Sequence, residues 1–239
     1  MQPSSPAQEQ FDRELDAVRR HLAAAAAEIV SPLSELVSAR IRAAMPHLCA
    51  AVVLAAAYNQ QDDDSSMQTR VSLAAALEML HIALSIHQLL AAASATDLDK
   101  SLIGSAILAG DYCFGRAARL AAQTDNPRIV AIFSHALQDI SENNLRALFD
   151  NRTAAPGTPA GSLSILLRSG AAAALELSNL SDSDRRTVLQ LAACSAAMQH
   201  TAPATPALLD ADMLATLPAS HQERWCALQR RFTSAAAGN

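Results

Sequence analysis

The sequence predicts an all-α protein, folded as one helical bundle. Its 239 residues are 51% hydrophobic but only 3% aromatic, and the aromatic and β-branched runs that favour strands are scarce. Alanine runs recur at residues 23–27, 91–93 and 171–174. Alanine is the best helix former, and its small side chain lets helices approach closely. A chain of this length can bury roughly 70–75% of its unfolded surface, so we expect a large core of tightly packed helices.

Apolar residues recur at helical spacing along most of the chain, so the predicted helices are separated by proline and polar signals. Pro32 fits the first turn of a helix with Ser31 as its N-cap, Pro46 interrupts the chain, and Ser181 caps a later helix. Residues 124–127 form a turn and cap signal. We expect helices at residues 9–30, 32–45, 47–58, 67–92, 100–123, 127–150, 162–177, 182–200 and 220–234.

The first eight residues are polar and include two prolines. We expect a disordered tail at residues 1–8 and a single domain at residues 9–239. The tail lacks the charged and apolar regions of a signal peptide. The longest apolar run, residues 48–58, is too short to span a bilayer. We therefore expect a cytoplasmic protein without a membrane span.

Charge and cysteine content exclude several classes of function. The net charge is −5 and the basic residues occur in isolated pairs, so no nucleic-acid-binding surface is expected. No C-x-x-C motif indicates a zinc site or a disulfide framework. Free cysteine in an apolar helix behaves as a small hydrophobic residue. We therefore expect buried structural thiols at Cys49, Cys113, Cys194 and Cys226.

Three consecutive aspartates, Asp62, Asp63 and Asp64, could suggest a metal site. They lie in the polar loop predicted for residues 59–66, just before a long helix. Negative charge is favourable ahead of a helix N-terminus, so we expect a solvated loop rather than a metal site. No glycine-rich phosphate loop, nucleophile elbow or H-E-x-x-H motif occurs in the chain.

Two stretches resemble one known family. Residues 74–87 read AAALEMLHIALSIH and residues 108–117 read LAGDYCFGRA. In this order, with a helix break between them, they resemble the trans-prenyl diphosphate synthases: the helix that leads into the first aspartate-rich motif, and the LAGDYL-x-x-RA stretch. The resemblance covers about residues 33–218. It implies a shortened helical bundle of the isoprenoid synthase type.

The resemblance also implies a reaction and its metal. In this family an allylic diphosphate ionises and isopentenyl diphosphate attacks the cation, while magnesium ions on two aspartate-rich motifs offset the charge of the leaving diphosphate. Here His87 is followed by Gln88, Leu89 and Leu90, and residues 191–200 contain no carboxylate. We therefore expect that the chain is not an enzyme on its own and binds no cofactor, with Mg²⁺ held by a catalytic partner.

The same resemblance assigns positions in a vestigial substrate site and no catalytic residue. The family's basic segment that grips isopentenyl diphosphate aligns with residues 41–46, where only Arg42 and Pro46 match. His81 matches a histidine that contacts isopentenyl diphosphate, but a structural role is favoured without the arginines. His87 and Gln88 border the missing aspartates, and Asp111 is expected to pack between helices. The positions are Arg42, His81, His87, Gln88 and Asp111.

Some systems of this family pair a non-catalytic subunit with a catalytic one, and the partner influences product length. We expect such a regulatory, chain-length-determining subunit of a heterodimeric polyprenyl diphosphate synthase, acting in isoprenoid or quinone side-chain biosynthesis. The expected interface is the alanine-rich face of residues 73–93 and the helix at residues 102–122. The alternative is a stand-alone homodimer that binds a prenyl chain or acts as a scaffold. Turnover by this chain alone would instead indicate an active magnesium-dependent synthase.

Overall fold

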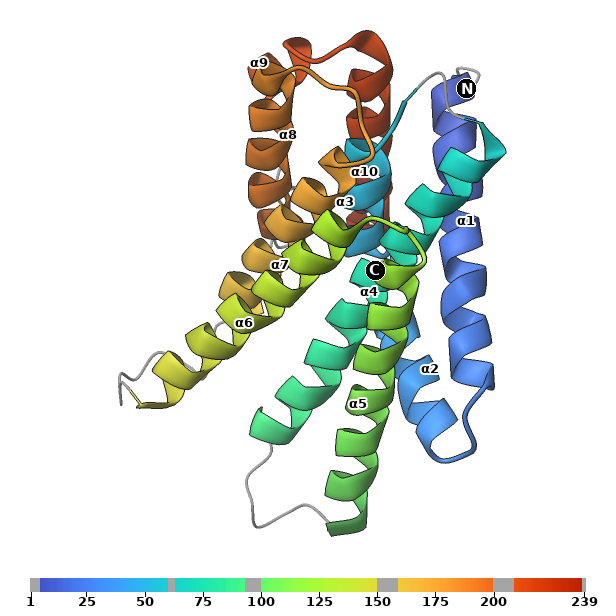
Figure 1. Ribbon diagram of the computed structural model, residues 1–239, viewed down its shortest axis with the longest axis vertical. Helices are drawn as coiled ribbons and strands as arrows, with labels where there is room; N and C mark the ends of the chain where they lie inside the picture. Colours follow the sequence, from blue (N-terminus) through green and yellow to red (C-terminus); the bar gives the residue numbers. More distant parts are fainter. Residues whose placement is uncertain (1–4, 60–62, 93–99, 150–158, 200–208, 238–239) are drawn as a thin grey trace.

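The computed structural model describes residues 5–59, 63–92, 100–149, 159–199 and 209–237 (Figure 1). Within these residues the chain forms ten α-helices, one short 3-10 helix and no strand, which confirms the predicted all-α class. The elements are α1 (Pro6–Ala27), α2 (Leu33–Ala43), α3 (Leu48–Ala56), α4 (Asp64–Ala92), α5 (Lys100–Ala122), α6 (Pro127–Phe149), α7 (Pro159–Leu175), α8 (Asp182–Ser195), η1 (Ala196–Gln199), α9 (Ala211–Ala215) and α10 (Ala219–Ala237).

The helix starts follow local capping chemistry. At α8 the Ser181 hydroxyl accepts a hydrogen bond from the Asp184 N–H, as predicted. Asp210 caps α9, a five-residue helix that the sequence analysis missed because it is too short to show a periodic pattern. Helix α1 begins at Pro6 behind a Ser5 cap, so residues 6–8, which were assigned to the tail, are helical. Residues 1–4 lie outside the described residues.

The described part of the aspartate run belongs to the start of α4. Asp63 Oδ1 accepts a hydrogen bond of 2.8 Å from the Ser66 N–H, which lowers the pKa of Asp63. Asp64 is the first residue of α4, three residues earlier than predicted. Asp62 lies outside the described residues. Asp63 therefore caps the helix, and both described aspartates complement its N-terminal dipole, as the sequence suggested.

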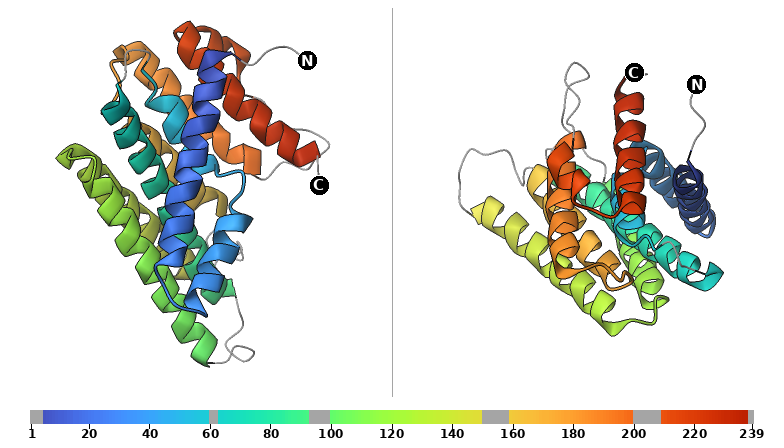
Figure 2. Two further views of the ribbon diagram at one scale, coloured as in Figure 1. Left: turned by 90° about the vertical axis from the view of Figure 1, so that its right-hand side faces the viewer. Right: turned by 90° about the horizontal axis from the view of Figure 1, so that it is seen from above.

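Helix α4 is the core of the bundle, in contact with α1, α2, α3, α5 and α7 (Figures 1 and 2). Residues 71–80 are buried on every side, which is the pattern of a helix that is apolar all round. The segment 64–89 is long and apolar enough to cross a membrane, but 83% of its most apolar window is buried inside the bundle. Helices α2 and α3 pass the same test only as a pair bent by 61°.

Burial of α4 corrects one prediction about the interface. Ala74, Ala75, Ala76 and Ala83 have no exposed surface. Their small side chains let neighbouring helices of the same chain pack closely. This part of the alanine-rich face is therefore not available to a partner subunit.

The cysteines divide into two classes. Cys49 on α3 and Cys113 on α5 are buried, as predicted, whereas Cys194 and Cys226 are exposed. The prediction is wrong for the latter two because α8 and α10 are amphipathic and both residues fall on the outer face. On α8, for example, the residues buried against the core are Val188, Leu191, Ala192 and Ser195.

Candidate functional site

The two stretches that carry the family resemblance pack against each other in the structure. They lie on α4 and α5, which run side by side (Figure 1). His87 Nε2 on α4 is 3.6 Å from Asp111 Oδ1 on α5, and the His87 ring meets Phe114 edge-on at 5.2 Å between centroids. Gly110 makes this approach possible, because a Cβ at that position would lie 2.0 Å from His87 Nε2. The structure therefore brings His87 and Asp111 together at one helix crossing.

The rest of the second stretch anchors α5 to α1. Tyr112 Oη donates a hydrogen bond of 2.7 Å to the Ala25 carbonyl, and Arg116 pairs with Glu28 at 2.8 Å. Arg116 therefore pairs with the C-cap residue of α1 and not with Asp111 on its own helix. The spacing of five residues between Asp111 and Arg116 had already argued against an ion pair between them. Asp111 itself is 61% exposed. It lies at the edge of the helix contact and not within it, contrary to the packing role predicted from sequence.

A buried polar cluster surrounds Glu78 one turn before His81 on α4. Glu78 is fully buried, and its Oε2 accepts a hydrogen bond of 2.9 Å from the Ala50 N–H. Its Oε1 lies 3.3 Å from His47 Nδ1 and 3.7 Å from His81 Nδ1. The Cys49 thiol is also part of this cluster: its Sγ and ligand atoms of Glu78 and His81 all lie within 4.8 Å of one another. The predicted site residue His81 therefore belongs to a four-residue polar group.

The Glu78 carboxylate also caps α3. Its bond to Ala50 supplies a negative group to a buried backbone N–H of the first turn, which has no partner within that helix. His47, which precedes α3, adopts a left-handed backbone with a φ of 69°. This conformation is uncommon for a residue other than glycine. Here it directs the buried imidazole toward Glu78.

The cluster is organised electrostatically around one carboxylate. Burial by itself raises the pKa of Glu78, but the imidazoles of His47 and His81 outweigh that effect and lower the pKa to about 2. Burial lowers the pKa of His81, but the neighbouring Cys49 and Glu78 raise it well above its ordinary value. Burial raises the pKa of the Cys49 thiol. In the absence of another cation, a protonated His81 balances the charge of Glu78.

The remaining predicted positions do not join either group. Arg42 is exposed near the end of α2, and its guanidinium forms no ion pair with a described residue. Gln88 is partly buried near the end of α4. Sequence reasoning assigned no site role to His47, Cys49 or Glu78. In the sequence, only the position of Glu78 three residues before His81 pointed to a site role for Glu78. No sequence motif linked Cys49 to either residue.

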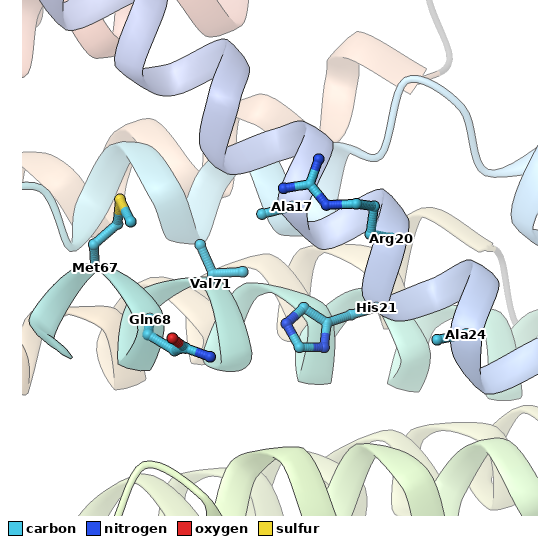
Figure 3. Close-up of a pocket in the computed structure, with 7 residues that line it drawn as sticks. All are labelled: Ala17, Arg20, His21, Ala24, Met67, Gln68 and Val71. Carbon is cyan, nitrogen blue, oxygen red and sulfur yellow. The ribbon is translucent and has the colours of Figure 1, made fainter. Parts of the chain in front are cut away.

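A separate groove of about 450 Å³ lies between α1 and α4 (Figure 3). Ala17, Ala24, Met67 and Val71 make its apolar surface, and Arg20, His21 and Gln68 add polar groups. Burial lowers the pKa of His21, and the charges of Arg116 and Arg20 lower it further. The groove contains none of the five positions predicted from the sequence.

Sequence comparison does not place the chain in a family. No protein-family model matches it. No curated protein matches it either.

Solved structures match the chain over almost its whole length. A polyprenyl synthase from Caulobacter crescentus, complexed with calcium and isoprenyl diphosphate, gives a TM-score of 0.68 at 18% identity, covering 98% of this chain and 100% of that one. The chain has the isoprenoid synthase fold. A decaprenyl diphosphate synthase from Rhodobacter capsulatus gives 0.58 at 19% identity, over 96% of this chain and 89% of that one. A geranyltransferase from Legionella pneumophila gives 0.59 at 15% identity, over 98% and 92%.

The matches contradict the prediction that the chain is not an enzyme on its own. The solved structures that this chain matches over 89% to 100% of their length are named as synthases or transferases. Proteins of both kinds are enzymes. The prediction rested on neutral side chains after His87 and on residues 191–200. Both arguments assumed that these residues align with the family's aspartate-rich motifs. A sequence only 13% to 19% identical to its structural relatives does not determine that alignment.

Among the described residues, the group of candidate ligands that could hold a metal ion is Cys49, Glu78 and His81. Mg²⁺ prefers an octahedron of oxygen ligands. A thiol and an imidazole do not fit that preference, so this group is not a magnesium site of the isoprenoid synthase kind.

Proposed function

We propose that this chain acts in the synthesis or binding of prenyl chains, as a chain-length-determining subunit of a polyprenyl diphosphate synthase assembly. The isoprenoid synthase fold supports the general role. The observation that carries the proposal is the packing of residues 74–87 against residues 108–117, through His87 and Gly110. The two stretches that resemble family motifs thus face each other in the fold that the family uses.

An exposed apolar surface on α5 is an argument that a partner chain binds there. Ile107 and Leu108 are 42% and 61% exposed, and Leu89 near the end of the adjacent α4 is 41% exposed. Large apolar side chains that lie together on a surface indicate an interaction site. Ile107 and Leu108 are neighbours on α5 shortly before Asp111, so a second chain bound there would touch the helix that carries the second motif. The proposed occupant is a prenyl diphosphate synthase chain of the same fold.

The test is co-expression with a prenyl diphosphate synthase that carries both aspartate-rich motifs. This chain, the partner and the mixture are each assayed with Mg²⁺, isopentenyl diphosphate and an allylic diphosphate, and product lengths are measured. We expect a complex whose products differ in length from those of the partner alone. Copurification without any change in product length or rate would contradict the chain-length role.

A surface variant tests the interface. Replacing Ile107 and Leu108 by lysine places two charges in the proposed contact and should dissociate the complex. The matched control is Leu145→Lys, since Leu145 is 51% exposed but lies on α6. A complex that survives the α5 variant, or is lost equally in the α6 variant, would rule out this surface. A homodimer in the absence of a partner, with bound prenyl chain, would favour the stand-alone alternative.

A further inference from the structure

The cluster of Cys49, Glu78 and His81 combines three kinds of zinc ligand. A thiolate, a carboxylate oxygen and an imidazole nitrogen each bind Zn²⁺ at about 2.0–2.3 Å, and tetrahedral ligands then lie roughly 3.3–3.7 Å apart. The three ligand atoms here are within 4.8 Å of one another, so side-chain adjustments of about 1 Å would close them around an ion. Glu78 and His81 project from the same face of α4 because they are three residues apart, and Cys49 faces them from α3.

The carboxylate is held in one orientation. Glu78 Oε2 is fixed by the Ala50 N–H at 2.9 Å, and the buried His47 imidazole lies 3.3 Å from Oε1. Groups that hydrogen-bond to a metal ligand and fix its direction are a regular part of metal sites. His47 and the Ala50 backbone fill that role here.

One polar atom of the cluster is left without a hydrogen bond. His81 Nδ1 is buried and has no hydrogen-bond partner, because the 3.7 Å to Glu78 Oε1 is too long for a hydrogen bond. Buried polar atoms are otherwise paired in native proteins. The His81 side chain is 20% exposed, whereas Glu78 and Cys49 are fully buried. The cluster is therefore closed on the core side and reachable from the His81 side.

We propose that Cys49, Glu78 and His81 bind one zinc ion, with a fourth position open to water on the His81 side. Three protein ligands and one open position form a common zinc arrangement. The ion would join α3 to α4 at the centre of the bundle. This proposal does not depend on the function proposed above, since it concerns only the metal and these ligands.

The decisive experiment uses a chain in which Cys49 is the only thiol. Cys113, Cys194 and Cys226 are replaced by serine, and the purified chain is titrated with Co²⁺, which reports thiolate coordination by a near-ultraviolet charge-transfer band and tetrahedral geometry by strong visible bands. We expect both signals, saturating at one ion per chain and displaced by Zn²⁺. Their absence would overturn the proposal, and this outcome does not depend on any ligand variant folding.

Ligand variants and a melting curve then locate the ion. Adding Cys49→Ser should remove the charge-transfer band, and His81→Asn should weaken zinc binding at least about tenfold in competition with a chromophoric chelator. The matched control is His135→Asn, an exposed histidine on α6, which should bind as before. Zinc should also raise the melting temperature of the chain with intact ligands. Equal binding by the His81 and His135 variants would overturn the assignment.

Discussion

Glu14 on α1 and Arg224 on α10 form an ion pair that is buried from solvent, although 210 residues separate them. Glu14 Oε2 accepts from Arg224 Nη1 at 2.5 Å, and Glu14 Oε1 accepts from Arg70 Nη2 on α4 at 2.6 Å. The Arg224 guanidinium also lies over the Tyr58 ring at 4.1 Å. One carboxylate therefore joins the first helix of the bundle to its central helix and its last helix.

Replacing Glu14 by alanine should destabilise the fold strongly. The variant leaves two buried arginines without their shared carboxylate, and removing one member of a buried ion pair costs about 3–5 kcal/mol. Urea unfolding followed by circular dichroism would measure the loss. The control is Asp16→Ala on the same helix, where a 57% exposed carboxylate pairs with Arg19 and the expected cost is about 0–1 kcal/mol. Equal costs for both variants would contradict the assigned role of Glu14.

Replacing Gly110 by alanine should disturb the crossing of α4 and α5. The added methyl would lie 2.0 Å from His87 Nε2, and overpacking of this kind costs about 1–3 kcal/mol. Gly115→Ala on the same helix is the matched control, since no atom lies within 4 Å of its added Cβ. That variant should stabilise the chain by about 0.5–1 kcal/mol, because alanine favours helix over glycine.

A double variant separates steric conflict from other effects at Gly110. If His87 causes the loss, truncating it to alanine should relieve most of the cost of Gly110→Ala. A double-mutant cycle of thermal or urea unfolding reports this coupling directly. Additive effects of the two substitutions would show that the glycine is needed for another reason.

Two of the four thiols should react rapidly with a disulfide reagent in the native chain. Cys194 and Cys226 are exposed, whereas Cys49 and Cys113 are buried. Burial raises the pKa of Cys113 to about 12 and also raises that of Cys49, and the thiol form is unreactive. Labelling at pH 8 in the presence of a chelator should stop at two thiols, and unfolding should release the other two. Fast labelling of more than two would disprove this division.

Glu78 should make the fold sensitive to acid. Its pKa falls from an ordinary 4.5 to about 2, so its contribution to stability is full above pH 4.5 and is lost as the pH falls toward 2. With a chelator present, wild type and Glu78→Gln should differ by roughly 3 kcal/mol at pH 6. That difference should shrink at pH 4 and again at pH 3. A difference in unfolding free energy that is independent of pH would show that charge on Glu78 is not what stabilises the cluster.

The helices could be predicted from the sequence because their signals are local. Ser181 sits before a periodic apolar segment, and that pattern fixes a helix start wherever it occurs. The helix predicted at residues 67–92 likewise follows from apolar residues at helical spacing, although its burial was not foreseen. Within the part of the chain that the structure describes, the one helix that was missed, α9, is too short to show a periodic pattern.

The candidate site could be predicted only in part. His81 and His87 were found by their motif, and the motif gave no information about what would face them. Cys49 comes from another helix, and its position opposite Glu78 and His81 depends on how α3 crosses α4. Arg42, also taken from the motif, is exposed and forms no ion pair with a described residue. The prediction that the chain is not an enzyme on its own was wrong because it relied on a few neutral residues after His87 and at residues 191–200, whereas the solved structures of the same fold are those of enzymes.

By itself, the sequence determined the helical class of the protein, most of its helices and its likeness to prenyl diphosphate synthases, because composition, periodicity and motif order are properties of neighbouring residues. Only the tertiary structure decided which alanines of α4 lie in the core, which cysteines face solvent, and that Glu78 gathers His47, Cys49 and His81 around it. Those outcomes depend on which helix faces pack together, and packing joins residues that the sequence keeps far apart.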